Sequence, residues 1–272
     1  MRRRPFDLRR ALAGLALLGA SSTGHAEPAT ASVPVADAPS AGASRLWIYL
    51  DASTVPDPGR VLSLSRMTFT NPGSGASRPF AADLAHPGPV QEIGAEAGIG
   101  RSFSLWINGT RLGLPPDDPV QSGMMAGVRW ALLSGERTTL TASMGALREL
   151  GGSYGAWSRL SIGQEMGRAR VGATVHAEHV LGPGRDDVDL MVFAGASYQV
   201  LGPLRLGIES FAQDLEEIGS SEGAEQGALL AAGPAVALEL MRRALWIGAS
   251  PSVGLSRGAP QTIGRFAIAY GF

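Results

Sequence analysis

The feature that most constrains this chain is a two-residue alternation of apolar side chains with polar or very small ones. In residues 169–181, every second residue from Val171 to Ala177 is apolar, and the residues between them are polar or glycine. Successive side chains of a β-strand point to opposite faces, so this pattern predicts strands with one apolar and one polar face. The same alternation recurs in 188–199, 204–214 and 244–256.

Less regular segments earlier in the chain extend the series to about twelve predicted strands. Segment 61–70 fits least well, because Arg66 shares a face with Leu62 and Leu64. Many of the segments are close to the ~9–11 residues that a tilted membrane strand needs, and longer than the roughly 5–6 residues typical of soluble strands. The predicted strands are 61–70, 90–99, 102–110, 122–132, 138–148, 154–165, 169–181, 188–199, 204–214, 226–239, 244–256 and 262–272.

The predicted fold is therefore all-β, a single up-and-down antiparallel transmembrane β-barrel of about twelve strands over residues 60–272. Connections such as 166–168 and 201–203 are short, whereas 71–89 and 111–121 on the other side are longer. Outer-membrane barrels place short turns in the periplasm and longer loops outside, which puts the C-terminus in the periplasm. The longest apolar run after residue 26, 228–238, is too short for a membrane helix, which needs about 20 residues.

The N-terminus predicts export from the cytoplasm. Residues 1–26 combine an arginine-rich start, the apolar run 11–20 and the small-x-small sequence Gly24-His25-Ala26, the order found in a signal peptide. Residues 27–59 begin with an Ala-, Pro- and Ser-rich stretch that predicts a flexible periplasmic leader. Within this leader, the apolar residues 46–52 could form a short extra strand or pack at the barrel mouth.

The chain ends RFAIAYGF, with Phe266, Ile268, Tyr270 and Phe272 on one face. This terminal strand resembles the C-terminal assembly signal of bacterial outer-membrane β-barrel proteins. The resemblance implies an outer-membrane location and recognition by the barrel-assembly machinery and periplasmic chaperones. The alternative is an edge strand of a soluble sheet, which would be exposed and prone to aggregate.

Aromatic residues give an independent indication of a membrane. If the C-terminus is periplasmic, Phe103, Trp130 and Tyr198 lie on the apolar face near the same end as Tyr270 and Phe272. Aromatic rings favour the membrane–water interface, and barrels carry such belts. Residues 90–110, VQEIGAEAGIGRSFSLWINGT, also resemble hairpins of outer-membrane proteins described as transporters, although this resemblance carries over no functional residue.

The polar face supplies the candidate functional residues. A narrow pore whose charges select solutes and a lumen closed by ion pairs are both consistent with charges of both signs among many small residues. A barrel of about twelve strands lies between the filled ~8-stranded and the open 16–18-stranded barrels. The predicted lumen charges are Glu92, Glu96, Arg129, Arg159, Arg170, His176, Glu178, Asp189, Arg205, Glu209, Glu239 and Arg265.

Motifs for enzymatic chemistry are weak. Residues 151–155 and 219–223 match G-x-S-x-G, but neither Ser153 nor Ser221 is predicted in the strand–turn–helix context of a nucleophile elbow. His176 and Glu178 share a face without a suitably placed serine, and His179 points to the opposite face, so the two histidines cannot share a metal on a regular strand. We predict no enzyme activity, no metal and no cofactor.

Composition narrows the remaining classes. The net charge of −1 gives no electrostatic case for nucleic-acid binding, and the absence of cysteine excludes a lipid-anchored cysteine and disulfides. The expected partners are outer-membrane lipid, the assembly factors and a small solute. We predict a narrow passive channel or transporter-like protein of unknown solute. The alternatives are a structural or surface-interaction barrel with an ion-paired closed lumen, a soluble periplasmic β-protein and a barrel hydrolase.

We expect the last strand to be required for membrane assembly. Replacing Tyr270 and Phe272 by Ala removes half of the apolar face of the terminal segment, so the variant should be degraded in the periplasm. Cell fractionation with heat-modifiable gel mobility measures the outcome. Wild-type amounts of inserted, heat-modifiable protein would show that these residues carry no assembly signal.

Overall fold

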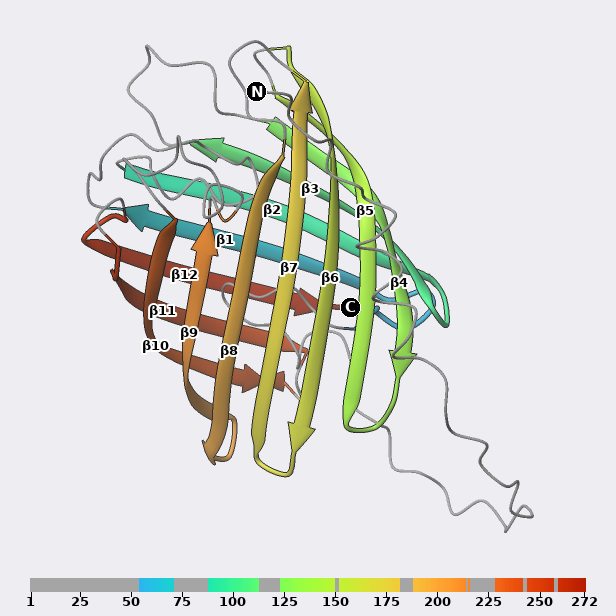
Figure 1. Cartoon of the computed structure of the whole chain (residues 1–272). Helices are drawn as coiled ribbons and strands as arrows, with labels where there is room; N and C mark the ends of the chain where they lie inside the picture. The colour runs from blue at the N-terminus through green and yellow to red at the C-terminus, as the bar shows by residue number, and fades with distance from the viewer. Residues whose placement is uncertain are drawn as a thin grey trace, which may run out of the picture. The chain divides into compact units, whose positions relative to one another are not determined.

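The computed structural model describes residues 54–70, 88–112, 123–149, 152–181, 188–213, 215, 228–241, 244–256 and 259–272. In these residues twelve antiparallel strands form a closed barrel, in which neighbours in sequence are neighbours in space (Figure 1). The strands are β1 Val61–Thr70, β2 Gly88–Gly100, β3 Phe103–Leu112, β4 Gly123–Ser134, β5 Thr138–Glu149, β6 Tyr154–Met166, β7 Ala169–Leu181, β8 Asp189–Leu201, β9 Leu204–Gln213, β10 Leu229–Leu240, β11 Leu245–Gly254 and β12 Thr262–Gly271.

This architecture confirms the predicted all-β, up-and-down antiparallel barrel. Each predicted strand is present, with boundaries that differ by a few residues at most. Within the described residues, no helix is long and apolar enough to cross a membrane. The predicted signal peptide, and the leader as far as residue 53 with its segment 46–52, lie outside the described residues and stay predictions.

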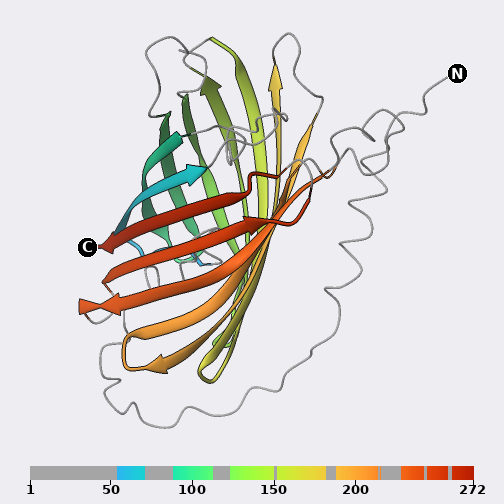
Figure 2. The ribbon, with the colours of Figure 1, turned by 90° about the vertical axis from the view of Figure 1, so that its left-hand side faces the viewer.

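The barrel closes where β1 meets β12. These strands pair antiparallel from Leu62 opposite Gly271 to Thr70 opposite Ile263, and Figure 2 shows them side by side. The backbone N–H groups of Val61 and Phe272 donate to each other's carbonyl oxygens, both at 2.9 Å. The final strand is therefore an internal strand of the barrel, and the alternative of an exposed edge strand is excluded.

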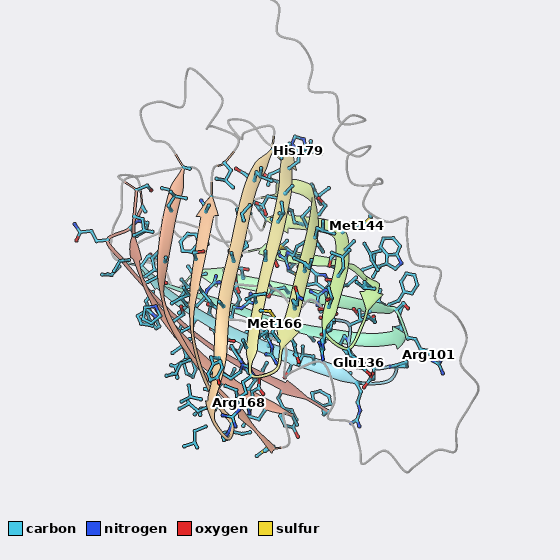
Figure 3. The ribbon with its side chains drawn as sticks, turned by 60° about the horizontal axis from the view of Figure 1, so that its bottom comes forward. Arg101, Glu136, Met144, Met166, Arg168 and His179 are labelled. Carbon is cyan, nitrogen blue, oxygen red and sulfur yellow. The ribbon has the colours of Figure 1, made fainter. Side chains whose placement is uncertain are left out.

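Short turns gather at one end of the barrel, here called the turn end. The connections between β2 and β3, β6 and β7, and β8 and β9 are two residues long, and Gly167 and Gly202 adopt φ values of +64° and +50° there. Such positive φ angles suit tight hairpin turns and favour glycine. Exposed charged residues lie in the turns at this end: Figure 3 labels Arg101, Glu136 of the three-residue β4–β5 turn, and Arg168.

The two faces of the sheet differ as the alternation predicts. Thr174 on the inner face is 1% exposed, whereas its neighbour Val175 on the outer face is 43% exposed. Met144 and Met166 are half exposed on the outer face, and so are the ring side chains Phe103, Tyr198 and Tyr270 near the turn end. The outer face thus presents an apolar surface of the kind that contacts lipid hydrocarbon.

We expect an arginine on the outer face to cost far more stability than one on the inner face. Val175→Arg or Val192→Arg should lower the free energy of unfolding in lipid by roughly 2–4 kcal/mol, the cost of Arg near the bilayer midplane. Arg at Thr174 or Gly195 faces the lumen, so its effect should be smaller or come from packing. Reversible unfolding in lipid vesicles measures these values, and equal costs on both faces would contradict this assignment.

Candidate functional site: the barrel lumen

The structure places the predicted lumen charges on the inner face of the barrel. Arg159 is half-buried, and the other side chains of the set are buried, with His176 fully so. A charge this poorly solvated needs a partner, because the desolvation penalty of an isolated buried ion is several kcal/mol. The contacts between these residues therefore determine what the lumen can do.

One group of contacts joins β2 to β5. Arg129 donates from Nη1 to Glu96 Oε2 at 2.7 Å and from Nε to Ser143 Oγ at 3.2 Å. Ser104 on β3 donates to the other oxygen of the Glu96 carboxylate. The ion pair is thus neutralised and hydrogen-bonded at both ends, which is the condition for a buried ion pair to be tolerated.

A second ion pair, formed by β1 and β2, lies on the same wall. Arg66 Nη1 is 3.2 Å from Glu92 Oε2. Next to it on β1, Arg265 of β12 donates from Nε to Thr68 Oγ1 at 2.9 Å. Charges of both signs therefore occur along the closing seam.

A third contact joins two strands that are three places apart in the barrel. Arg170 on β7 is 3.4 Å from Glu239 on β10, a strand that is not its neighbour in the sheet, and 3.1 Å from Glu165 on β6. The adjacent Arg205 on β9 donates to Ser197 Oγ at 3.4 Å and to the carbonyl oxygen of Arg168 at 3.2 Å. This group ties together the inner walls near the turn end.

Two tryptophans form an aromatic pair on the inner wall. In the strand register, Trp106 lies opposite Gly127, Gly127 opposite Gly145, and Gly145 opposite Trp157. The Trp106 and Trp157 ring centroids are 4.6 Å apart, so the indoles extend across the two glycines. A Cβ at Gly127 or Gly145 would lie 2.4 or 2.6 Å from a ring carbon of Trp157, which explains why only glycine fits there.

Arg159 completes this aromatic cluster. Its guanidinium carbon is 5.6 Å from the Trp106 ring centroid and 5.5 Å from that of Trp157, within range of cation–π attraction to both. Its Nε donates to His176 Nδ1 at 3.0 Å. Arginine has no acceptor, so His176 Nδ1 must be unprotonated. The proton of this neutral ring is then on Nε2, 3.2 Å from Glu178 Oε2.

This arrangement bears directly on the hypothesis that His176 is a catalytic base. Both ring nitrogens of His176 are engaged, one by Arg159 and one by Glu178, and the side chain is fully buried. A general base must reach the proton that it removes, and no nitrogen of this ring faces open space. The geometry therefore favours a structural role for His176.

The inner face is less polar than the sequence indicated. Leu62 and Leu64 on β1 pack with Trp246 on β11 and with alanines of β10 and β12. Strands β4 to β7 contribute a second apolar cluster, and Trp106 packs against it. Its members are Met125, Leu147, Trp157 and Val180. Segment 61–70 fitted the alternation poorly because its leucines share the inner face with Arg66. The structure gives the reason: these leucines point inward and pack against Trp246.

Sequence reasoning missed the lumen tryptophans, although a signal was present. Trp106 shares its parity with Ser104 and Asn108, and Trp157 shares its parity with Arg159 and Ser161, so parity alone assigns both rings to the polar face. An indole ring carries no charge, so a candidate set defined by charge does not contain these side chains.

Space remains between these groups. A cavity of about 60 Å³ is bordered by three arginines and two glutamates together with apolar and amide side chains. A smaller cavity of about 20 Å³ lies beside Arg170, Arg205, Glu209 and Trp246. By volume the larger one accommodates several water molecules. Its lining includes Leu62, Leu64, Arg66, Glu92, Glu96, Trp106, Asn108, Met125, Arg129 and Arg159.

The structure adds little support for the serine-nucleophile and metal-site motifs. Ser153 lies in the turn between β5 and β6, where its carbonyl oxygen accepts a hydrogen bond from Glu149 N, and a strand follows it rather than a helix. Ser221 and residues 216–227 lie outside the described residues. In the part of the chain that the structure describes, no group of three or more His, Asp or Glu residues is placed to hold a metal ion.

Comparison with known proteins agrees with this architecture. No protein-family model and no curated protein sequence matches the chain. Among solved structures, the KdgM porin in complex with disordered oligogalacturonate is similar over 78% of this chain and 99% of that chain, with a TM-score of 0.53 and 7% sequence identity. An outer membrane channel from Pseudomonas putida F1 is similar over 80% of this chain and 97% of that chain, with a TM-score of 0.51 and 8% identity. The chain therefore has the fold of bacterial outer-membrane β-barrel channels.

We expect the glycines beneath the tryptophan pair to be intolerant of side chains. Gly127→Ala should lower the free energy of unfolding by roughly 1–3 kcal/mol, the usual cost of overpacking, because the new Cβ meets the Trp157 ring and the Met144 carbonyl. Gly109→Ala is the matched control, since its Cβ would be no closer than 3.9 Å to any neighbour. Unfolding in lipid and tryptophan fluorescence measure the two effects. Equal stability of the variants would mean that the indoles do not pack across the glycines.

Proposed function

We propose that this protein is a narrow passive channel in a bacterial outer membrane for small polar or charged solutes. The observation that carries the proposal is the cavity of about 60 Å³ inside a closed barrel, bordered by ionised side chains of both signs. An apolar outer face and a lumen lined by polar groups are features of water-filled barrels in membranes, so both support the proposal.

The outer face supports this location. Phe103 and Trp130, with ring centroids 5.5 Å apart, and Tyr270 and Phe272, 5.8 Å apart, form aromatic pairs near the turn end. Such rings favour the membrane–water interface, and outer-membrane barrels place their short turns in the periplasm, so rings and turns together support assigning the turn end to the periplasmic side. Lipid, the barrel-assembly machinery and periplasmic chaperones are then the expected partners, with Phe266, Ile268, Tyr270 and Phe272 as the assembly signal.

The charges around the cavity would determine which ions pass. Arg66 and Arg129 pair with Glu92 and Glu96, while Arg159 is held by rings and His176. Low-dielectric walls focus the field of each charge on a permeating ion. With three arginines and two glutamates at the cavity, the wild-type channel should prefer anions weakly.

One observation favours a second candidate function, a structural barrel with a closed lumen. The Arg170–Glu239 ion pair and the tryptophan pair join strands that are not neighbours, and both reduce the free cross-section. In this alternative the ion pairs serve stability and no solute passes. The two functions differ in a single measurable property, which is conductance.

We expect purified, folded protein in planar bilayers to give small, discrete current steps. Absence of steps from heat-modifiable, correctly folded protein would support the closed structural barrel. Heat-denatured protein prepared in the same way is the control for leaks caused by detergent or lipid.

We expect the lumen charges to set the sign of ion selectivity. Neutralising Arg129, Arg159, Arg170 and Arg205 with Gln should raise the cation-to-anion permeability ratio severalfold, and Glu92→Gln with Glu96→Gln should lower it. Reversal potentials in a salt gradient measure both shifts. Arg148→Gln is the matched control, because Arg148 lies exposed on the outer face against Tyr154. Unchanged selectivity in both sets would place the constriction away from these residues.

A further inference from the structure

Residues 54–57, which lie shortly before β1, are packed against the barrel wall. Thr54 and Val55 are each only 9% exposed, and Pro56 is buried, although none of them belongs to a strand. We call residues 54–57 the mouth strap. Their burial requires a neighbouring surface, and the glycine pattern of β2 identifies it.

Gly98 lies beneath the strap at the turn end of β2. It has the same parity as the inward residues Glu92 and Glu96, so a side chain at this position would point into the lumen. A Cβ on Gly98 would lie 2.3 Å from the carbonyl oxygen of Asp57 and 2.4 Å from that of Pro56. The strap backbone therefore crosses the inner wall of the barrel in the space that a side chain at Gly98 would fill.

Three backbone hydrogen bonds anchor the end of the strap. Gly59 N donates to the Gly98 carbonyl oxygen at 2.9 Å, Gly98 N donates to Arg60 O at 3.0 Å, and Arg60 N donates to Asp57 O at 2.9 Å. Gly59, with φ of +79°, makes the bend that connects the strap to β1, and a Cβ there would meet no atom within 4 Å. The bend therefore has open space where a side chain would be, while the strap itself rests on the wall.

We propose that the mouth strap is a gate: folded against Gly98 it narrows the turn-end mouth of the lumen, and swung out about Gly59 it widens that mouth. The proposed gate requires the proposed channel function. The position of the strap does not depend on that function. Segments held by few contacts open locally at a small fraction of the free energy of global unfolding. Among the described residues, the backbone hydrogen bonds at the strap involve only Asp57 and the bend at residues 59–60, so opening the strap breaks few of them.

Thiol labelling tests the position of the strap without any current measurement. The chain contains no cysteine, so a single reporter is specific. Thr54→Cys should react slowly with a membrane-impermeant maleimide, and Asp57→Cys, at an exposed position, should react fast. The double variant Thr54→Cys with Gly98→Val should be labelled roughly tenfold faster or more than Thr54→Cys alone. The valine side chain would occupy the space of the strap backbone and keep the strap away from the wall.

The matched control is Gly100→Val, two residues along the same strand, where a Cβ would meet nothing within 4 Å. It should leave the labelling of Thr54→Cys slow. Val55→Asp is a second way to release the strap, by making its burial costly while β2 stays unchanged, and it serves if Gly98→Val does not give a heat-modifiable barrel. Slow labelling in both release variants, or fast labelling of Thr54→Cys alone, would overturn the proposed strap position.

Conductance then tests the gate. Both release variants should show larger single-channel steps than wild type, and Gly100→Val should not. Faster labelling with unchanged step size overturns the gate while leaving the channel intact. Zero current from wild type and every folded variant overturns the channel function, and the gate with it, although the labelling contrast still decides the position of the strap.

Discussion

The constraint on which this structure depends is the need of every backbone amide and carbonyl group for a hydrogen-bond partner. In hydrocarbon each unsatisfied group costs several kcal/mol, and no water is present to take the place of a missing strand. The antiparallel register of β1 against β12 meets this need by joining the ends of the sheet. Once the sheet is closed, alternate side chains must face lipid and lumen, and the character of each face follows from that geometry.

Packing inside the barrel depends on the positions where glycine leaves the inner wall without a side chain. Gly127 and Gly145 leave the inner wall flat under Trp157, and Gly98 leaves it flat under the strap. Large rings and a backbone segment can therefore lie against the sheet, which a β-branched residue would prevent. The interior is consequently a mixture of tight packing and small cavities, in which arginine, glutamate and aromatic groups satisfy one another.

The strands and their faces could be predicted from the sequence because a sheet with lipid on one side needs an apolar residue at every second position. Val175 outside and Thr174 inside follow from parity alone. The contacts of the candidate site did not follow in the same way. The meeting of Trp106 with Trp157, or of Arg170 with Glu239, depends on the stagger of several strands and the curvature of the barrel. Neither the stagger nor the curvature can be predicted from the residues of one strand. The burial of Val55 was also beyond prediction, because residues 54–57 have no periodicity to indicate a face.

The closing seam has a consequence for the order of events in folding. Ser63 on β1 donates a hydrogen bond to the carbonyl oxygen of Tyr270, and these residues are 207 positions apart in the chain. Contacts over such separations slow folding, because chain entropy is lost before they form. The first strand can therefore gain its second partner only after the last residues of the barrel have been synthesised. Until β12 pairs with β1, a partly formed sheet has two unpaired edges, which can pair with other strands and aggregate.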